Sequence, residues 1–96
     1  MKVVLRIARR GGPPDRVEVF VDWPSESVRR VLSRGELPYL LGYDTGLFAD
    51  VCGLVELVAN WGEARGANHP SAHRAHLEWR GGGAVFVEID DAPPGA

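Results

Sequence analysis

Two stretches of the chain, residues 1–23 and residues 73–90, alternate apolar and polar residues with a period of two. Each is interrupted by residues that do not continue a strand, the Gly/Pro-rich residues 9–15 in the first and residues 81–83, all glycine, in the second. Because successive side chains of a strand point to opposite faces, the pattern predicts two antiparallel hairpins, each with one apolar row. The expected inward-facing residues are Val3, Leu5, Ile7, Val17, Val19, Val21, Leu77, Val85, Val87 and Ile89.

Apolar residues recur at helical spacing in the middle of the chain. Residues 25–34 predict a short helix, with Ser25 placed to cap its free amide groups and Gly35 placed to end it in a left-handed conformation. Residues 47–61 predict a longer helix that is apolar over much of its circumference. A helix of this kind is buried on more than one side, either within the fold or against a second chain.

The connections between these elements are predicted to lack regular structure. Residues 36–46 contain large apolar groups, but proline and glycine residues interrupt them at Pro38, Gly42 and Gly46. Residues 62–72 are expected to form a polar loop, and residues 91–96 a flexible C-terminal tail. The sequence therefore predicts one two-layer α+β domain over residues 1–90, with a four-stranded antiparallel sheet, the order ββααββ and two helices on one face.

The composition is that of an ordinary soluble globular chain. Of the 96 residues, 45% are hydrophobic and 25% are charged, and no apolar run is long enough to span a membrane. The second charge, Arg6, comes too early for a signal peptide, and the single cysteine, Cys52, fits a reducing compartment. We therefore expect a cytoplasmic protein with no membrane partner.

Charge is distributed unevenly along the chain. Residues 1–34 carry eight basic and four acidic groups, a balance of +4, whereas residues 35–96 carry three basic and nine acidic groups, a balance of −6. The simplest expectation is that the two halves of one fold attract each other. The alternative is a bipolar surface that steers a charged partner.

One tripeptide matches a known active-site motif. Asp44, Thr45 and Gly46 are similar to the active-site tripeptide of retroviral-type aspartic proteases, in which paired aspartates activate water. However, Leu47 stands where that family has a small residue, and the residues that follow are predicted to be helical, whereas the family is rich in β-structure. The tripeptide is therefore expected to cap the second helix through Asp44 or Thr45.

No other residues form a convincing catalytic or metal-binding set. His69, His73 and His76 have the spacings of four and three that suit a Zn²⁺ or Ni²⁺ site on a helix. Pro70 interrupts such a helix, and the predicted strand places His73 and His76 on opposite faces. Cys52 lies on the apolar stripe of the longer helix as a small buried hydrophobic residue. We expect no catalytic residue, no metal and no cofactor.

The remaining candidates for a functional surface are exposed aromatic residues and their neighbours. If the apolar rows pack against the helices, Phe20 and Phe86 point outward among charged side chains, as at an interface with a polar rim. Scattered exposed apolar residues are the ordinary alternative on a soluble protein. The candidate interface residues are Phe20, Phe86, Val4, Glu18, Glu88, Tyr39 and Tyr43.

These features favour a non-enzymatic protein-interaction module that binds a protein partner or a second copy of itself. Small, acidic, cytoplasmic chains often act as bacterial immunity proteins, antitoxins or regulatory subunits, so we expect occlusion, in which an acidic, aromatic-bearing face covers a basic site on the partner. Two alternatives stay open. The Arg-rich N-terminal third is suited to nucleic acid, which the net charge of −2 disfavours. A pocket near Tyr39 and Tyr43 would suit a small enzyme or ligand-binding domain.

Overall fold

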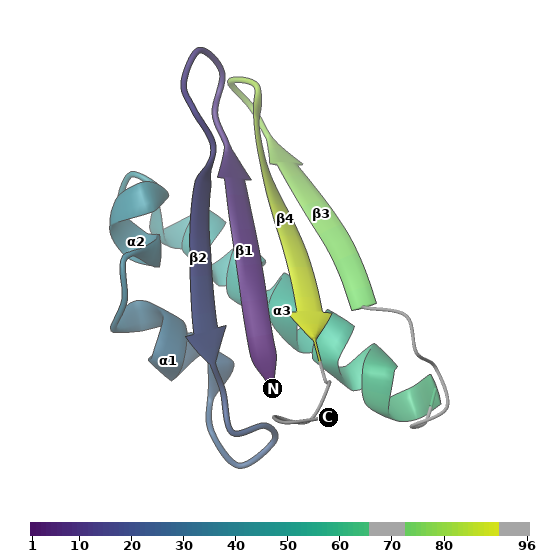
Figure 1. Cartoon of the computed structure of the whole chain (residues 1–96). Coiled ribbons are helices and arrows are strands. Elements are labelled where there is room, and N and C mark those ends of the chain that lie inside the picture. The colour runs from purple at the N-terminus through teal and green to yellow at the C-terminus, as the bar shows by residue number, and fades with distance from the viewer. Residues whose placement is uncertain (66–72, 91–96) are drawn as a thin grey trace.

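The computed structural model describes residues 1–65 and 73–90, and the side chains of residues 1–60 and 74–90. One antiparallel sheet has the strand order β2-β1-β4-β3, formed by β1 Lys2–Ala8, β2 Asp15–Phe20, β3 His73–Trp79 and β4 Gly83–Asp90. The helices α1 Val28–Ser33, α2 Leu37–Leu40 and α3 Thr45–Arg65 cover one face of this sheet (Figure 1). The predicted α+β architecture and the order ββααββ are confirmed, with one additional short helix.

The inward rows of the sheet form one side of the core. At the centre of the sheet, Leu5 on β1 lies opposite Val17 on β2 and Val87 on β4. Leu5 and Val87 are buried, whereas Val17 is only half-buried because β2 is an edge strand. The buried side chains of this face are Val3, Leu5, Ile7, Val85, Val87 and Ile89. The period-two pattern therefore predicted the buried face correctly.

The helices supply the other side of the core. Their buried residues, together with those of the connections, are Val21, Val28, Leu32, Leu37, Leu41, Val51, Cys52, Val55, Val58 and Ala59. On α3 these residues cover a wide arc, while Leu57 remains 63% exposed on the opposite side of the helix. No helix within the described residues is long and apolar enough to cross a bilayer.

The ends of α1 differ from the prediction. Ser27 is the N-cap, and its hydroxyl accepts a hydrogen bond from the N–H of Arg30 at 3.3 Å. Ser25 hydrogen-bonds within the turn that precedes the helix, so it does not cap it. Gly35 is not left-handed: its N–H donates to the carbonyl of Leu32 at 3.4 Å, which tightens the last turn. The first error arose because the helix begins later than its first capping-type residue, and the second because the last turn closes through an i→i−3 hydrogen bond, with no left-handed residue.

The helix α2 was missed because residues 36–46 were expected to lack regular structure. Pro38 lies in the first turn of α2, where a missing N–H removes no intrahelical hydrogen bond. Leu37 and Leu41 are buried, so core packing stabilises a helix that is too short to persist alone. The large apolar residues of this segment were therefore the correct signal, and the proline was not a break.

The long helix α3 exceeds its predicted range at both ends. Asp44 precedes it, and Asp44 Oδ1 accepts a hydrogen bond from the N–H of Leu47 at 3.0 Å. The predicted capping role of Asp44 is therefore confirmed. Residues 62–65, expected in a polar loop, are helical, since residues 63–65 are good helix formers that follow an already packed helix. Residues 66–72 and the predicted tail, residues 91–96, lie outside the described part of the chain.

The tips of the two hairpins lie next to each other at one end of the sheet (Figure 1). Gly81 and Gly82 have φ angles of 105° and 87°, which glycine adopts without steric cost. A Cβ at Gly82 would lie 3.1 Å from Cδ of Arg10 in the other hairpin, and a Cβ at Gly83 would overlap the ring of Trp79. The glycines thus allow Trp79 and Arg10 to pack closely against the backbone of the second hairpin.

Candidate functional site

The outward face of the sheet brings together side chains from all four strands. The pairing register places them in rows that cross the sheet from β2 to β3. The two central rows are Glu18, Val4, Glu88 and Arg74, and Arg16, Arg6, Phe86 and His76. Direct neighbours within a row have Cβ atoms about 4.5–5.5 Å apart, so each row is a line of contacts.

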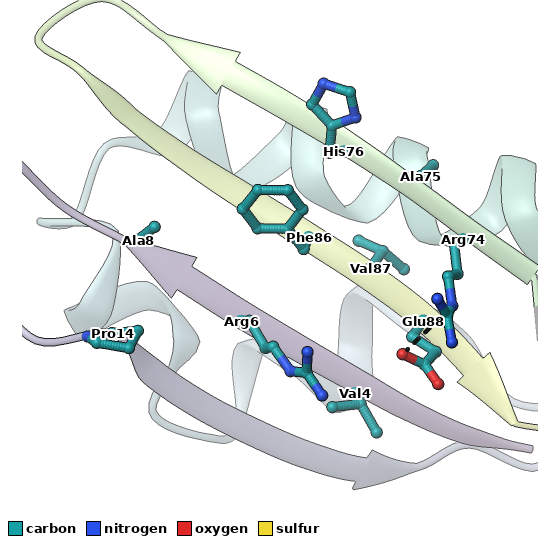
Figure 2. Close-up of a pocket in the computed structure, with 10 residues that line it drawn as sticks. All are labelled: Val4, Arg6, Ala8, Pro14, Arg74, Ala75, His76, Phe86, Val87 and Glu88. Atoms are coloured by element: carbon teal, nitrogen blue, oxygen red, sulfur yellow. Dashed lines mark ion pairs between the residues drawn. The ribbon is translucent and has the colours of Figure 1, made fainter.

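A hollow of about 460 Å³ lies over these rows (Figure 2). We call it the outer hollow, and the residues that line it are Val4, Arg6, Ala8, Pro14, Arg74, Ala75, His76, Phe86, Val87 and Glu88. Its residues come from β1, β3 and β4 and from the residue before β2, so it exists only when the sheet is assembled. A hollow of this size accommodates a small ligand or one or two side chains of a partner protein.

Val4 and Phe86 are the two largest apolar side chains that point outward into the outer hollow. Val4 points outward but is only 6% exposed, because neighbouring long side chains cover it with their apolar stems. Phe86 is 48% exposed and stacks on the ring of His76, with ring centroids 5.7 Å apart and an interplanar angle of 24°. Phe86 is therefore an exposed aromatic anchor held in place by its neighbour, and Val4 forms the floor beside it.

The charges around the hollow are balanced, so the expected acidic face is not observed. Lys2 Nζ lies 2.7 Å from Glu18 Oε1, and Arg16 also binds Glu18. The hydrogen bonds from Lys2 and then from Arg16 lower the pKa of the Glu18 carboxyl. On the other side of the hollow, Arg74 Nε lies 3.6 Å from Glu88 Oε2. Both predicted interface carboxylates are thus engaged by basic residues of this chain.

One cation of the hollow differs from the others. Arg6 is exposed, lies between Arg16 and Phe86 in its row, and forms no ion pair with any residue that the structure describes. Figure 2 shows the Arg6 guanidinium directed towards Val4, on the face of the sheet that also carries the Phe86 ring. A partner can therefore place a carboxylate or phosphate oxygen on Arg6 and an apolar group on Phe86. The chemistry of the outer hollow is therefore that of an apolar surface with one available cation.

Phe20 lies on the same face as Phe86 but outside the hollow. It is 71% exposed and lies opposite Lys2, whereas Phe86 lies opposite Arg6. Four residues along the strands and two strands across separate the two rings by about 17 Å. The predicted shared face is correct in orientation, but the structure does not bring the two phenylalanines into one cluster.

The tyrosine pair forms a separate surface beside the hairpin tips. Tyr39 and Tyr43 are 67% and 71% exposed, and their rings meet edge to face with centroids 6.1 Å apart. Tyr39, but not Tyr43, lines a second hollow of about 500 Å³, together with Arg9, Arg10, Leu40, Leu41, Gly42, Leu47, Trp79, Gly81 and Gly83. The guanidinium of Arg9 is engaged there by the carbonyl oxygen of Leu40 and lies 3.5 Å from Asp15 Oδ2.

The residues considered for other chemistry do not assemble. Within the described residues, no three His, Cys, Asp or Glu side chains are arranged to bind a metal ion. The strand register puts His73 and His76 at positions of opposite parity, and His69 lies outside the described residues. Cys52 is buried, and burial, opposed by Arg29, raises the pKa of its thiol to about 11. A thiol of this kind is protonated at neutral pH and is not a nucleophile.

The sequence prediction did not include Arg6, Arg74 or His76 among the site residues. Alternation alone places Arg6 and His76 on the outward face, and this was the available signal. Their proximity to Phe86 depends on the pairing of β4 with both β1 and β3, which no local pattern encodes. Comparison with protein-family models, with curated proteins and with solved structures found no match to this chain.

Proposed function

We propose that this chain is a non-enzymatic protein-interaction module that binds a partner protein across the outer hollow of its sheet. The observation that supports this most directly is Phe86, an aromatic side chain that is 48% exposed at the centre of a hollow with an apolar floor. Interfaces concentrate their binding energy in such central aromatic groups. The charged side chains around Phe86 supply the polar rim that an interface needs.

The charges of the hollow also indicate the chemistry of the partner. Glu18 and Glu88 already have basic partners within the chain, so a basic site on another protein gains little from them. Arg6 is available, so the partner best suited to this face places an apolar side chain on Phe86 and a carboxylate over Arg6. Binding in this way occludes a site on the partner, as expected of a regulatory or immunity-type protein, but the site is mixed in character and not basic.

The size of the effect follows from the exposed part of Phe86. A phenylalanine has about 200 Å² of surface, so 48% exposure leaves roughly 100 Å² for a partner to cover. At about 25 cal/mol per Å², covering this area is worth ~2.5 kcal/mol, or about 60-fold in Kd. Phe86→Ala should therefore weaken partner binding by at least about tenfold, even if the partner covers only half of the ring.

The matched control is Phe20→Ala, which removes an equally large ring from the same face outside the hollow. Each variant, tagged and isolated from the native source, would be compared with the parent by quantitative mass spectrometry. The partner identified in this way would then be purified and titrated calorimetrically. We expect the partner to be lost with Phe86→Ala and retained with Phe20→Ala. Equal retention by both variants, with intact circular dichroism spectra, would contradict the proposal.

A second candidate is a ligand-binding role for the hollow beside Tyr39. Its support is geometric: Tyr39 and Trp79 provide aromatic walls, and Arg9 and Arg10 provide cations, around about 500 Å³. A small-molecule ligand that raises the melting temperature of the parent but not of Tyr39→Ala would favour this role. The nucleic-acid alternative has no comparable support, because the arginines of the N-terminal third are divided among the outer face, the first hairpin tip and α1.

A further inference from the structure

The strand β3 forms an edge of the sheet that is suited to pairing with another strand. In the order β2-β1-β4-β3 its far side pairs with no strand of residues 1–65 and 73–90. It is seven residues long, His73–Trp79, and contains neither proline nor glycine. Edges of this length are usually blocked by proline, bulges or inward-pointing charges, because their free N–H and C=O groups are a template for another strand. β3 has neither a proline nor a bulge, and its charged side chains, Arg74 and Glu78, point outward.

The sequence of β3 is complementary to itself in the antiparallel direction. If two copies pair with His76 opposite His76, then Arg74 of each lies opposite Glu78 of the other, on the outward face. On the inward face, Ala75 lies opposite Leu77. Arg74 and Glu78 have side chains that are 72% and 77% exposed, so both are accessible for such contacts. This single register produces two symmetric ion pairs and two apolar contacts.

We propose that two copies of this chain associate through β3, antiparallel and centred on His76, to form one continuous eight-stranded sheet. Such an interface is isologous, because the same strand serves both copies and the twofold axis closes the assembly. The proposal goes beyond the function proposed above and does not depend on it.

An exposed flank of α3 lies on the side of this edge. Leu47 lines the hollow that also contains Trp79 of β3, and Leu54 follows about two turns later on the same flank. Cys52, on the opposite flank, is close enough to Arg29 of α1 for that charge to act on its thiol. Leu54 is partly buried on this flank, whereas Leu57, which is 63% exposed, lies on the side of the helix that faces away from the core.

The other edge strand, β2, is less suited to this role. Its only glutamate, Glu18, lies 2.7 Å from Lys2, also contacts Arg16 and is 33% exposed. Arg74 and Glu78 of β3 have longer contacts within the chain, 3.6 Å and 3.9 Å, and are more than 70% exposed, so they are more accessible to a second copy. The strand β2 is one residue shorter than β3 and follows Pro13 and Pro14, which lack N–H donors. In Figure 1, α1 and α2 also lie on the β2 side of the sheet.

Association through β3 has a consequence for the outer hollow. Arg74, Ala75 and His76 line the hollow and also belong to the proposed interface. The two hollows of a dimer would therefore adjoin each other across the twofold axis, on the same face of the continuous sheet. A partner with two matching segments would bind both hollows at once, and the affinity would then rise through effective concentration.

Charge reversal tests the register directly. Arg74→Glu and Glu78→Arg each convert two attractive contacts into repulsive ones, so each should raise the dimer Kd by at least about tenfold in sedimentation velocity experiments. The double variant restores both pairs in reversed order and should return the Kd to within about threefold of the parent. Arg16→Glu, the same change on the other edge strand, should leave the Kd unchanged. All variants would first be checked by thermal melting.

Cross-linking provides an independent measurement at the twofold axis. His76→Cys would place two thiols directly opposite each other, with Cα atoms about 4.5–5.5 Å apart, within the range of a disulfide. Arg80→Cys is the control, since the two copies of that position would lie about 27 Å apart. We expect a disulfide-linked dimer on non-reducing gels for His76→Cys alone. A chain that is monomeric at ~100 μM, or a dimer whose Kd is unchanged by both charge reversals, would overturn the proposal. Neither result would affect the test based on Phe86, which measures partner capture by each copy.

Discussion

The position of Val55 on α3 gives a quantitative test of how the helix layer packs on the sheet. Val55 is fully buried, whereas Leu57, two residues later, is 63% exposed. We expect Val55→Asp to destabilise the protein severely and Leu57→Asp to have little effect. The two changes introduce the same carboxylate on the same helix and differ only in the side of α3 on which they lie.

The magnitude follows from the burial of each side chain. Removing a fully buried valine costs about 1.5–2 kcal/mol of transfer free energy, and an unpaired buried carboxylate adds at least ~2 kcal/mol even when it becomes protonated. A domain of 96 residues has a total stability of about 5–14 kcal/mol. Val55→Asp should therefore remove roughly 4 kcal/mol or more, which is most of the stability at the lower end of this range. Leu57→Asp should cost less than ~1 kcal/mol.

Urea denaturation followed by far-ultraviolet circular dichroism measures both changes. Val55→Thr is a useful graded variant, because it keeps the shape of valine and should cost about 1–2 kcal/mol through its unpaired hydroxyl. Each titration should be repeated at two protein concentrations, so that any contribution of a dimer to Leu57→Asp is recognised by its concentration dependence. Equal losses for Val55→Asp and Leu57→Asp in the monomer would mean that α3 is rotated about its axis relative to the structure.

Two further predictions concern single groups. Asp44→Ala should destabilise the protein by about 1 kcal/mol in the same urea assay, because the N–H of Leu47 loses its cap, and Asp44→Asn should recover most of this loss. Because the pKa of Cys52 is about 11 in the folded protein, above its ordinary value, the contribution of this thiol to stability is complete at pH 8 and is lost as the pH rises towards 11. Cys52→Ala should therefore show a smaller decrease in stability between pH 8 and pH 10.5 than the parent, and an identical decrease would contradict the assignment.

The hairpins and their buried faces were predictable because the alternation of inward and outward side chains along a strand is a local property of the sequence. Leu5, Val87 and their neighbours face the core for the same reason that they alternate with polar residues in the sequence. The helix ends were less predictable, since Ser25 and Ser27 are both capping residues and only the geometry of the preceding turn selects Ser27. The helix α2 was missed for a related reason. Pro38 was interpreted as a break, but a proline is compatible with the first turn of a helix and incompatible only with its interior.

The set of residues that line the outer hollow depends on the order of the strands in the sheet, which the alternation of side chains along each strand does not determine. The alternation of side chains correctly placed Phe20 and Phe86 on one face of the sheet, but it could not show how far apart they are. β1 lies between β2 and β4, and the two rings are four residues apart along the strand direction. The true neighbours of Phe86 are Arg6 and His76, from strands about 80 and 10 positions away in the sequence. Predicting the site would have required the pairing of the first strand with the last.

The uneven charge of the two halves of the chain also acquires a different meaning from the structure. The ion pairs among the described residues join Lys2, Arg9 and Arg16 to carboxylates of the first half, and Arg74 and His76 to carboxylates of the second. These ion pairs lie within each half, and the two halves meet through the pairing of β1 with β4 and the apolar core beneath it. That pairing leaves Arg6, part of the excess positive charge of the first half, beside Phe86 and without a carboxylate partner among the described residues. The charge asymmetry thus leaves a cation on the face that carries the aromatic anchor, which is why we propose for this face a partner with a carboxylate and an apolar side chain in place of a basic partner.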